Sequence, residues 1–302
     1  MEIVDAQVHL NMVGLQAGLV AMDAAGIDAL VIDEFWGFDE HGRPLPNYPL
    51  SGGSVRHTSP LGEEAVARHP DRFAYVTRVQ PDDPGLEEVI ATVRERPGRL
   101  ALRILPFVPK PPSAGESPEN LAAVAAFAEE LTGGRYDRYF ALAERHSVPV
   151  FLQVNGIGIP GRLDAIEHIA RHHPQLTVVI DHLGVAMPGS RAARPGRFAQ
   201  FEEVATLARF PNVALKWGHA TRLSEEPYPY QDVRTALHRI VEAFGAERIM
   251  WASDWTIDLD WSSWAESFSY IRDDEMLSQD DRAAILGGTV RRLLGWPASP
   301  AP

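Results

Sequence analysis

Nearly continuous runs of apolar and β-branched residues recur along the chain, and each is followed by a segment with the apolar repeat of an amphipathic helix. Continuous runs, rather than alternating ones, are typical of strands that are buried on both faces of a parallel sheet. We expect strands at residues 3–9, 29–32, 73–77, 100–105, 149–153, 177–181, 213–216 and 249–252. Helices are expected at residues 15–25, 62–69, 86–96, 121–146 with an interruption at 133–134, 162–172, 197–209, 231–244, 262–272 and 279–294.

This repeated order of strand and helix predicts a (β/α)8 TIM barrel of the α/β class. A doubly wound open sheet is the alternative, but that fold usually has a Gly-rich turn after its first strand, and this sequence has none there. Barrels of about 250 residues fold as one domain, so we expect residues 1–302 to form a single domain. The connection over 33–60 is long and rich in Gly, Pro and aromatic residues. We expect it to lie over the C-terminal mouth of the barrel.

Titratable residues stand at the ends of four predicted strands: His9, His182, Lys216 and Asp254. Burying such a group after an apolar strand is costly unless it has a partner or a purpose. The C-terminal ends of the strands of a parallel barrel meet at one mouth, where barrel enzymes carry their active sites. We therefore expect these four side chains to converge. The structural alternatives are a buried histidine bonded to the backbone, or a lysine that only pairs with a carboxylate.

On these motifs the chain resembles the amidohydrolase superfamily, and within it the amidohydrolase 2 group of lactonases and decarboxylases. The resemblance covers nearly the whole chain. It rests on Asp5-Ala6-Gln7-Val8-His9, Asp181-His182-Leu183-Gly184, Ala252-Ser253-Asp254-Trp255, Lys216 and Arg103. It implies a barrel hydrolase similar to sugar lactonases and to pyrone dicarboxylate lactonases.

The sequence departs from the metal-dependent relatives at Gln7 and Gln153, where those proteins place histidines. Of the metal ligands of those relatives, His9 and Asp254 are retained. Amide oxygens are weak ligands for zinc, which prefers imidazole or thiolate. We therefore expect no metal cofactor, as in the metal-free lactonases that the chain resembles. The alternative is one divalent metal, Zn or Mn, at His9 and Asp254.

Asp254 is expected to be the general base that activates a water, with its basicity raised by the apolar neighbours Trp251 and Trp255. His9 and His182 complete the expected catalytic group. Asp181 is expected to point to the other side of its strand and to be structural. The residues expected to bind substrate are Gln7, Gln153, Lys216, Arg103, Arg56, His57, Trp36 and Trp255. Further candidates for lining the pocket are Asn155, Trp217, His219 and Asp258.

These assignments predict a hydrolase that opens a lactone, with a small anionic or polyhydroxylated substrate. A lactone isomerase that uses the same residues is one alternative, and a metal-dependent decarboxylase or hydrolase is another. A barrel that only binds a ligand is a fourth interpretation, and it is disfavoured because such a pocket has no use for a buried base such as Asp254.

The net charge of −13 disfavours nucleic acid and anionic membrane surfaces as partners, since both are polyanions. There is no cysteine, which excludes disulfides and thiolate metal sites. The sequence shows neither a secretory signal pattern nor an apolar run that could span a bilayer. We expect a cytoplasmic enzyme with a small-molecule substrate, and a homo-oligomer is one quaternary state that the sequence allows.

Overall fold

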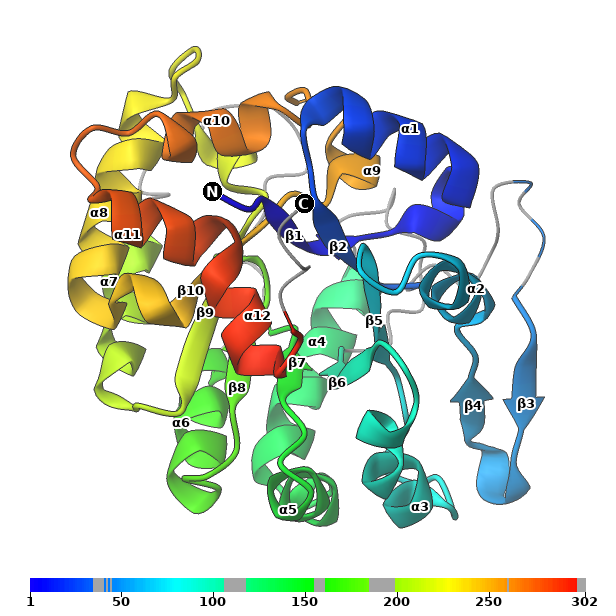
Figure 1. Cartoon of the computed structure of the whole chain (residues 1–302). Coiled ribbons are helices and arrows are strands. Elements are labelled where there is room, and N and C mark those ends of the chain that lie inside the picture. Colours follow the sequence, from blue (N-terminus) through cyan, green and yellow to red (C-terminus); the bar gives the residue numbers. More distant parts are fainter. Residues whose placement is uncertain are drawn as a thin grey trace.

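The computed structural model describes residues 1–34, 41, 43, 45–105, 118–154, 161–184, 199–259 and 261–297. Within them, strands of one parallel sheet curve around a common axis, with helices on the outside (Figure 1). In sheet order the strands are β1 (Val4–Val8), β2 (Ala29–Ile32), β5 (Phe73–Thr77), β6 (Arg99–Ile104), β7 (Val150–Leu152), β8 (Val178–Ile180), β9 (Val213–Gly218) and β10 (Ile249–Ala252). Neighbouring strands in this order pair in parallel. The predicted (β/α)8 barrel and its eight strands are confirmed.

Strands β1 and β10 come together at the seam of the barrel. The backbone N–H of Asp254 donates to the carbonyl of Gln7 over 3.2 Å. The Asp5 carboxylate of β1 accepts from the backbone N–H of Ser253 at 2.9 Å and from the Trp264 indole at 2.8 Å. Asp5 is completely buried, and this burial raises its pKa to about 7. Asp5, the first residue of the motif Asp5-Ala6-Gln7-Val8-His9, thus joins the two ends of the sheet.

The helices lie around the sheet in chain order. They are α1 (Leu15–Ala25), α2 (Pro60–Arg68), α3 (Leu86–Ala91), α4 (Pro118–Thr132), α5 (Asp137–Arg145), α6 (Arg162–His172), α7 (Ala199–Ala205), α8 (Gln231–Phe244), α9 (Trp255–Asp258), α10 (Glu266–Arg272), α11 (Gln279–Ala283) and α12 (Thr289–Leu294). The predicted bounds of α1, α6 and α8 are confirmed to the residue. The predicted break at 133–134 separates α4 from α5, where Gly134 has a positive φ of 90°.

The predicted helix at 279–294 is instead divided by a π-helical turn, Ala284–Gly288. Gly287 lies against the start of β1, where a Cβ atom would stand 2.9 Å from the carbonyl oxygen of Glu2. Only glycine permits this approach, which brings the last helix against the barrel.

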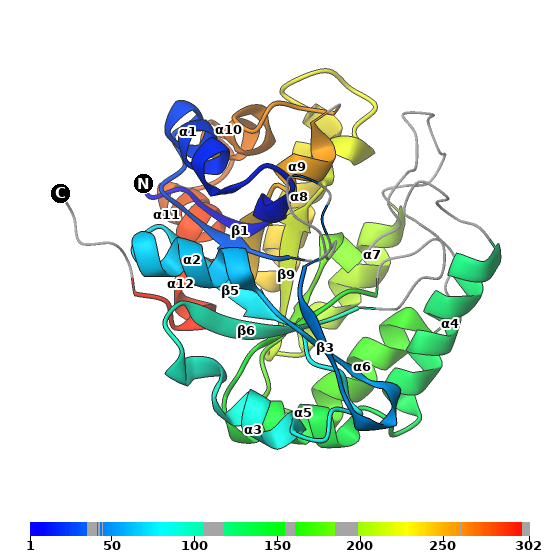
Figure 2. The same ribbon diagram turned by 90° about the vertical axis from the view of Figure 1, so that its right-hand side faces the viewer.

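Apolar side chains fill the barrel interior. One buried cluster takes residues from every strand of the barrel sheet, which only the inside of a barrel permits: Val4, Ala6, Val31, Val76, Ala101, Phe151, Val179, Ala214 and Met250. Val290, Leu294 and Trp296 belong to the same cluster. The C-terminal segment with α12 therefore closes the end of the barrel at which the strands begin, on the left in Figure 2. The opposite end, where the strands finish, is left for the site.

The long connection after β2 contains a hairpin of β3 (Asn47–Pro49) and β4 (Val55–His57), which the sequence did not predict. Three-residue strands are too short to show an alternating pattern. The hairpin is anchored on the loop after β5, where the Arg56 guanidinium donates to the Asp83 carboxylate over 3.0 and 2.6 Å. Residues 35–40, 42 and 44 of this connection lie outside the described part, so its placement over the mouth stays a prediction.

Among the described residues, none of the helices combines the length and the hydropathy that crossing a membrane requires.

Candidate active site

The alternation of side chains along the strands places charged groups on the inner face at the C-terminal end of the barrel. In each of five strands, the last apolar residue that faces the barrel interior is followed two positions later by a charged residue. These charged residues are Asp33, Arg103, Asp181, Lys216 and Asp254, and each is at most 2% exposed. They form the floor of the candidate site.

Arg103 and Lys216 balance the charge of two of these carboxylates. The Nε atom of Arg103 donates to Asp181 at 2.7 Å, and its Nη1 atom contacts the carboxylate of Asp33. The ammonium of Lys216 lies 2.9 Å from the other oxygen of Asp181 and 3.8 Å from the ring centre of Phe151. Burial alone would raise the pKa of Asp181, but Lys216 and Arg103 outweigh it and hold this pKa below its usual range. Burial lowers the pKa of Lys216 to about 8.

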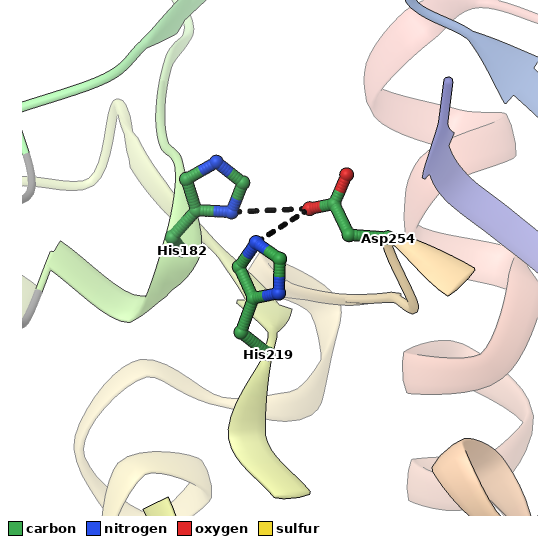
Figure 3. A group of neighbouring side chains, drawn as sticks. All are labelled: His182, His219 and Asp254. Carbon is green, nitrogen blue, oxygen red and sulfur yellow. Dashed lines mark ion pairs between the residues drawn. The ribbon is translucent and has the colours of Figure 1, made fainter. Parts of the chain in front are cut away.

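Three imidazoles surround the carboxylate of Asp254. His182 Nδ1 and His219 Nε2 lie 3.2 and 3.1 Å from its Oδ2 atom (Figure 3), and His9 Nε2 lies 3.2 Å from its Oδ1 atom. The side-chain amide of Gln7 donates to Oδ1 over 2.9 Å. Burial acts to raise the pKa of Asp254, but His219, His182 and His9 hold it well below its ordinary value. The expectation that apolar neighbours raise the basicity of this carboxylate is therefore wrong, because polar neighbours dominate.

His182, His219 and Asp254 have left-handed backbones, with φ of 49°, 56° and 49°. Each follows directly on a strand or within two residues of its end. Such a conformation is uncommon outside glycine and is concentrated at functional sites. It also explains why the expected orientation of Asp181 is wrong: alternation turns Asp181 into the barrel, and the left-handed turn brings His182 to the same mouth. Both contact Arg103, with His182 Nε2 at 3.3 Å.

The outer nitrogens of His9 and His219 have different partners. His9 Nδ1 lies 2.8 Å from the backbone carbonyl of Asp33, which only accepts, so this nitrogen carries a hydrogen. His219 Nδ1 lies 2.8 Å from the carboxylate of Asp258. Burial lowers the pKa of His9, and burial with the nearby His219 lowers that of His182 to about 4. Burial opposes charge on His219 as well, but Asp258 and Asp254 outweigh it and raise its pKa.

The charges of this group therefore compensate one another. The carboxylates of Asp33, Asp181 and Asp254 face the cations of Arg103 and Lys216, and the imidazolium that the raised pKa of His219 favours. His182 is neutral near pH 7, because its pKa is lowered to about 4. The group thus combines an ionised carboxylate at Asp254, a neutral imidazole at His182 and a charged imidazole at His219, each at most 8% exposed.

One set of donors in the described part of the chain has the arrangement that a metal ion requires. Ligand atoms of His182, His219 and Asp254 all lie within 4.8 Å of one another. The contact of His219 with Asp258 is the kind that orients a metal-bound imidazole. His182 Nδ1 is buried, and its neighbour in this set is the carboxylate of Asp254 at 3.2 Å. These donors fit a divalent metal better than the pair of His9 and Asp254 that the sequence suggested. The expected absence of a metal stays a prediction.

The remaining predicted substrate contacts occupy different surroundings. Gln153 accepts from Arg103 Nη2 at 2.9 Å, at the edge of the floor. Arg56 is held by Asp83, and His57 is half-buried beside Arg78, where burial and this cation lower its pKa to about 4. Trp255 stacks on Trp264 with ring centres 4.3 Å apart. Trp36 and Asn155 lie outside the described residues. Contact of these residues with a substrate stays a prediction.

Two acidic residues and one histidine have more central places than the sequence suggested. Asp33 was not identified at all, although it stands two positions after the inward-facing Val31 and so has the same signal as Arg103 and Lys216. His219 and Asp258 were expected only to line the pocket. His219 stands one residue past the end of β9, and strand alternation could not reveal the left-handed turn that directs it to Asp254.

Known proteins resemble this chain both in sequence and in fold. The chain is 30% identical over 149 residues to an L-fucono-1,5-lactonase of Burkholderia ambifaria, a match that covers 45% of this chain and 48% of that protein. The chain thus spans about half the length of that relative. Two solved structures share the fold over nearly both whole chains.

One of them is an amidohydrolase from Burkholderia multivorans with bound zinc, with a TM-score of 0.67, 17% identity and coverage of 98% of this chain and 100% of that chain. The other is a protein from Pseudomonas putida assigned as a 2-pyrone-4,6-dicarboxylic acid hydrolase, with a TM-score of 0.66, 21% identity and coverage of 99% of each chain. The family model described as Amidohydrolase matches residues 12–296, and the chain therefore belongs to the amidohydrolase family that its strand-end motifs predicted.

Proposed function

We propose that this protein is a hydrolase that opens a lactone ring, with Asp254 taking the proton from the attacking water. The observation that carries the proposal is the buried, ionised carboxylate of Asp254 among three imidazoles at the mouth of the barrel. The curated relative is a sugar lactonase, and one structural neighbour is assigned as a pyrone dicarboxylate hydrolase. Both point to a cyclic ester, and we propose a small anionic or polyhydroxylated one.

In the proposed reaction the water oxygen bonds to the lactone carbonyl carbon while Asp254 accepts one water proton. The negative charge moves from Asp254 to the former carbonyl oxygen. The imidazolium of His219 lies 3.1 Å from Asp254 and stabilises the negative charge in either place, so the net charge of the site does not change. The bond from the carbonyl carbon to the ring oxygen then breaks, and the ring oxygen takes the proton back from Asp254. The product is a hydroxy acid.

The low pKa of Asp254 makes it a weak base in the free protein. The balance of charges explains how it can still act. Once Asp254 has accepted the water proton, it is a neutral carboxylic acid. The imidazoles that had held its carboxylate ionised then face this acid and the adjacent oxyanion of the substrate. An oxyanion donor of this kind is worth about 3 kcal/mol in the transition state. His182 and His219 are the side chains that we propose for this role.

We propose that hydrolysis needs no metal, because the amides of Gln7 and Gln153 are bonded to Lys216, Asp254 and Arg103 and are not available as ligands. Metal-assisted hydrolysis is the second candidate. It is favoured by the converging donors of His182, His219 and Asp254, which would hold the ion. A bound divalent metal would supply Lewis acidity and lower the pKa of a coordinated water.

The test is turnover of a sugar 1,5-lactone and of 2-pyrone-4,6-dicarboxylate in water enriched in ¹⁸O. Hydrolysis places one labelled oxygen in the carboxylate of the product. A changed lactone without label would identify an isomerase, and release of carbon dioxide would identify a decarboxylase. Turnover that is lost in Asp254→Asn and retained in a folded variant of the exposed Met276, Met276→Leu, would connect the activity to this site. If neither substrate is opened, lactone hydrolysis of these two classes is refuted.

A further inference from the structure

A chain of buried polar contacts crosses the barrel from β8 to β10 beneath the imidazoles. The carboxylate of Asp181, just after β8, holds the ammonium of Lys216 on β9 at 2.9 Å. Lys216 donates to the side-chain oxygen of Gln7 on β1. The side-chain nitrogen of Gln7 then donates to both oxygens of Asp254, at 2.9 and 3.2 Å. All four side chains are at most 1% exposed.

The amide of Gln7 can be placed in two orientations, but its neighbours permit only one. An ammonium donates and cannot accept, so the amide atom next to Lys216 must be the oxygen. A carboxylate accepts and cannot donate, so the amide atom next to Asp254 must be the NH2 group. The opposite orientation would place donor against donor and acceptor against acceptor where no water can relieve the repulsion.

Lys216 is itself held in a fixed place. Asp181 binds it from one side, the ring of Phe151 lies 3.8 Å from its nitrogen, and the Gln7 oxygen takes a further donor. Asp181 in turn is fixed by the Nε atom of Arg103. The position of the charge that orients the amide is thus determined by strands distant from Asp254 in the sequence.

We propose that Lys216 and Asp181 are positioning residues that orient the Gln7 amide, and that this amide fixes the Asp254 carboxylate in the geometry for taking a proton. The inference rests on the proposed function of Asp254. It gives Gln7 and Lys216 a different role from the direct substrate contact expected from the sequence. In this role they act on turnover through Asp254 and do not act on substrate affinity.

The experiment compares Lys216→Met with the double variant Lys216→Met/Asp181→Asn. The single variant leaves a carboxylate without its ammonium, whereas the double variant removes one charge of each sign and keeps the floor balanced. Neither variant has the ammonium that orients the amide. We therefore expect both to lose about 10²-fold in kcat with KM changed by less than about threefold, since small misplacements of a reacting group have effects of this size. The double variant is expected to regain thermal stability without regaining turnover.

The matched control is Arg291→Met, which removes another buried cation. Arg291 pairs with Glu2 at 2.6 Å and lies over the Trp296 ring at the closed end of the barrel. We expect it to lower the melting temperature and to leave kcat unchanged. A loss of kcat in this control as large as in Lys216→Met would overturn the proposal, because the effect would then follow from removing any buried cation.

A second measurement does not depend on activity. In protein labelled with ¹⁵N in its glutamine side chains, the signals of Gln7 are those that disappear in Gln7→Met. We expect these amide hydrogens to exchange slowly with solvent in the wild type, and at least about tenfold faster in both Lys216 variants. Unchanged exchange in Lys216→Met, or recovery of kcat in the double variant, would overturn the proposal. If the wild type opens no lactone, the proposed function fails, and the exchange measurement still decides the orientation of Gln7.

Discussion

The side chain of Glu34 gives the protein a predicted pH dependence of stability that one substitution can isolate. Glu34 follows β2, is 3% exposed, and accepts from the backbone N–H of Gly62 in the first turn of α2 at 2.7 Å. Its other oxygen has no hydrogen-bond partner among the described residues. Burial raises the pKa of this carboxyl from 4.5 to about 7. Glu34→Gln keeps the acceptor for Gly62 and removes the titration.

The direction of this pH dependence follows from which state of the protein, folded or unfolded, binds the proton of Glu34. Between pH 4.5 and about 7 the folded protein holds the proton on Glu34, whereas the unfolded chain has released it. Folding therefore takes up a proton in this window, and the unfolding free energy of the wild type falls as the pH rises through it. The unfolding free energy changes by about 1.4 kcal/mol for each pH unit, so the decrease over the whole window is about 3 kcal/mol. The dependence levels off above pH 7.

The assay is urea unfolding of wild type and Glu34→Gln at half-unit steps from pH 5 to pH 8.5. We expect the variant to gain about 2 to 3 kcal/mol relative to the wild type over this range. Asp5, whose pKa burial also raises to about 7, is present in both proteins, so its contribution cancels in the difference. A difference that stays constant from pH 5 to pH 8.5 would refute the reasoning. Glu34 would then be ionised in the folded protein throughout.

Three further predictions concern the site. Asp254→Asn should lower kcat by about 10²-fold or more with an unchanged circular dichroism spectrum, since losing a general base has effects of this size; near-normal turnover would place the base elsewhere, with His182 the next candidate. Arg103→Met should lower the unfolding free energy in urea by about 3 to 5 kcal/mol, because Asp33 and Asp181 lose the cation between them; a negligible change would mean that these carboxylates are protonated or solvated. Elemental analysis should find less than one equivalent of divalent metal, and a chelator should leave activity intact; zinc that is stoichiometric and is lost together with activity would favour metal-assisted hydrolysis.

Local patterns in the sequence determined the barrel and the elements that build it. Continuous apolar runs identify strands because both faces of each strand are buried, one inside the barrel and one under the helices. The bounds of α1, α6 and α8 that the apolar repeats predicted agree with the structure. The hairpin β3–β4 and the π-helical turn at Ala284–Gly288 did not follow. The hairpin strands are too short to have a period, and the turn depends on a contact with Glu2 at the other end of the chain.

The sequence by itself also determined which residue types close the strands, and it is for this reason that His9, His182, Lys216 and Asp254 were identified. Only the tertiary structure decided what these side chains do to one another. Gln7 and Asp254 are 247 positions apart in the chain, Lys216 and Gln7 are 209 apart, and Arg103 and Asp181 are 78 apart. The first two pairings depend on the curvature that brings β1 beside β10, and the third on the sheet order that places β6 and β8 on either side of β7.

The same is true of the protonation of the site. The sequence suggested that apolar neighbours would raise the pKa of Asp254, whereas three imidazoles lower it. The assumption that His182 continues the strand placed Asp181 away from the mouth, whereas a left-handed turn at His182 brings both side chains to it. The sequence determines which side chains are buried at each strand end, since burial follows from local periodicity. The tertiary structure decides which charges and donors meet there, because electrostatic energies depend on distances between strands that are remote in the chain.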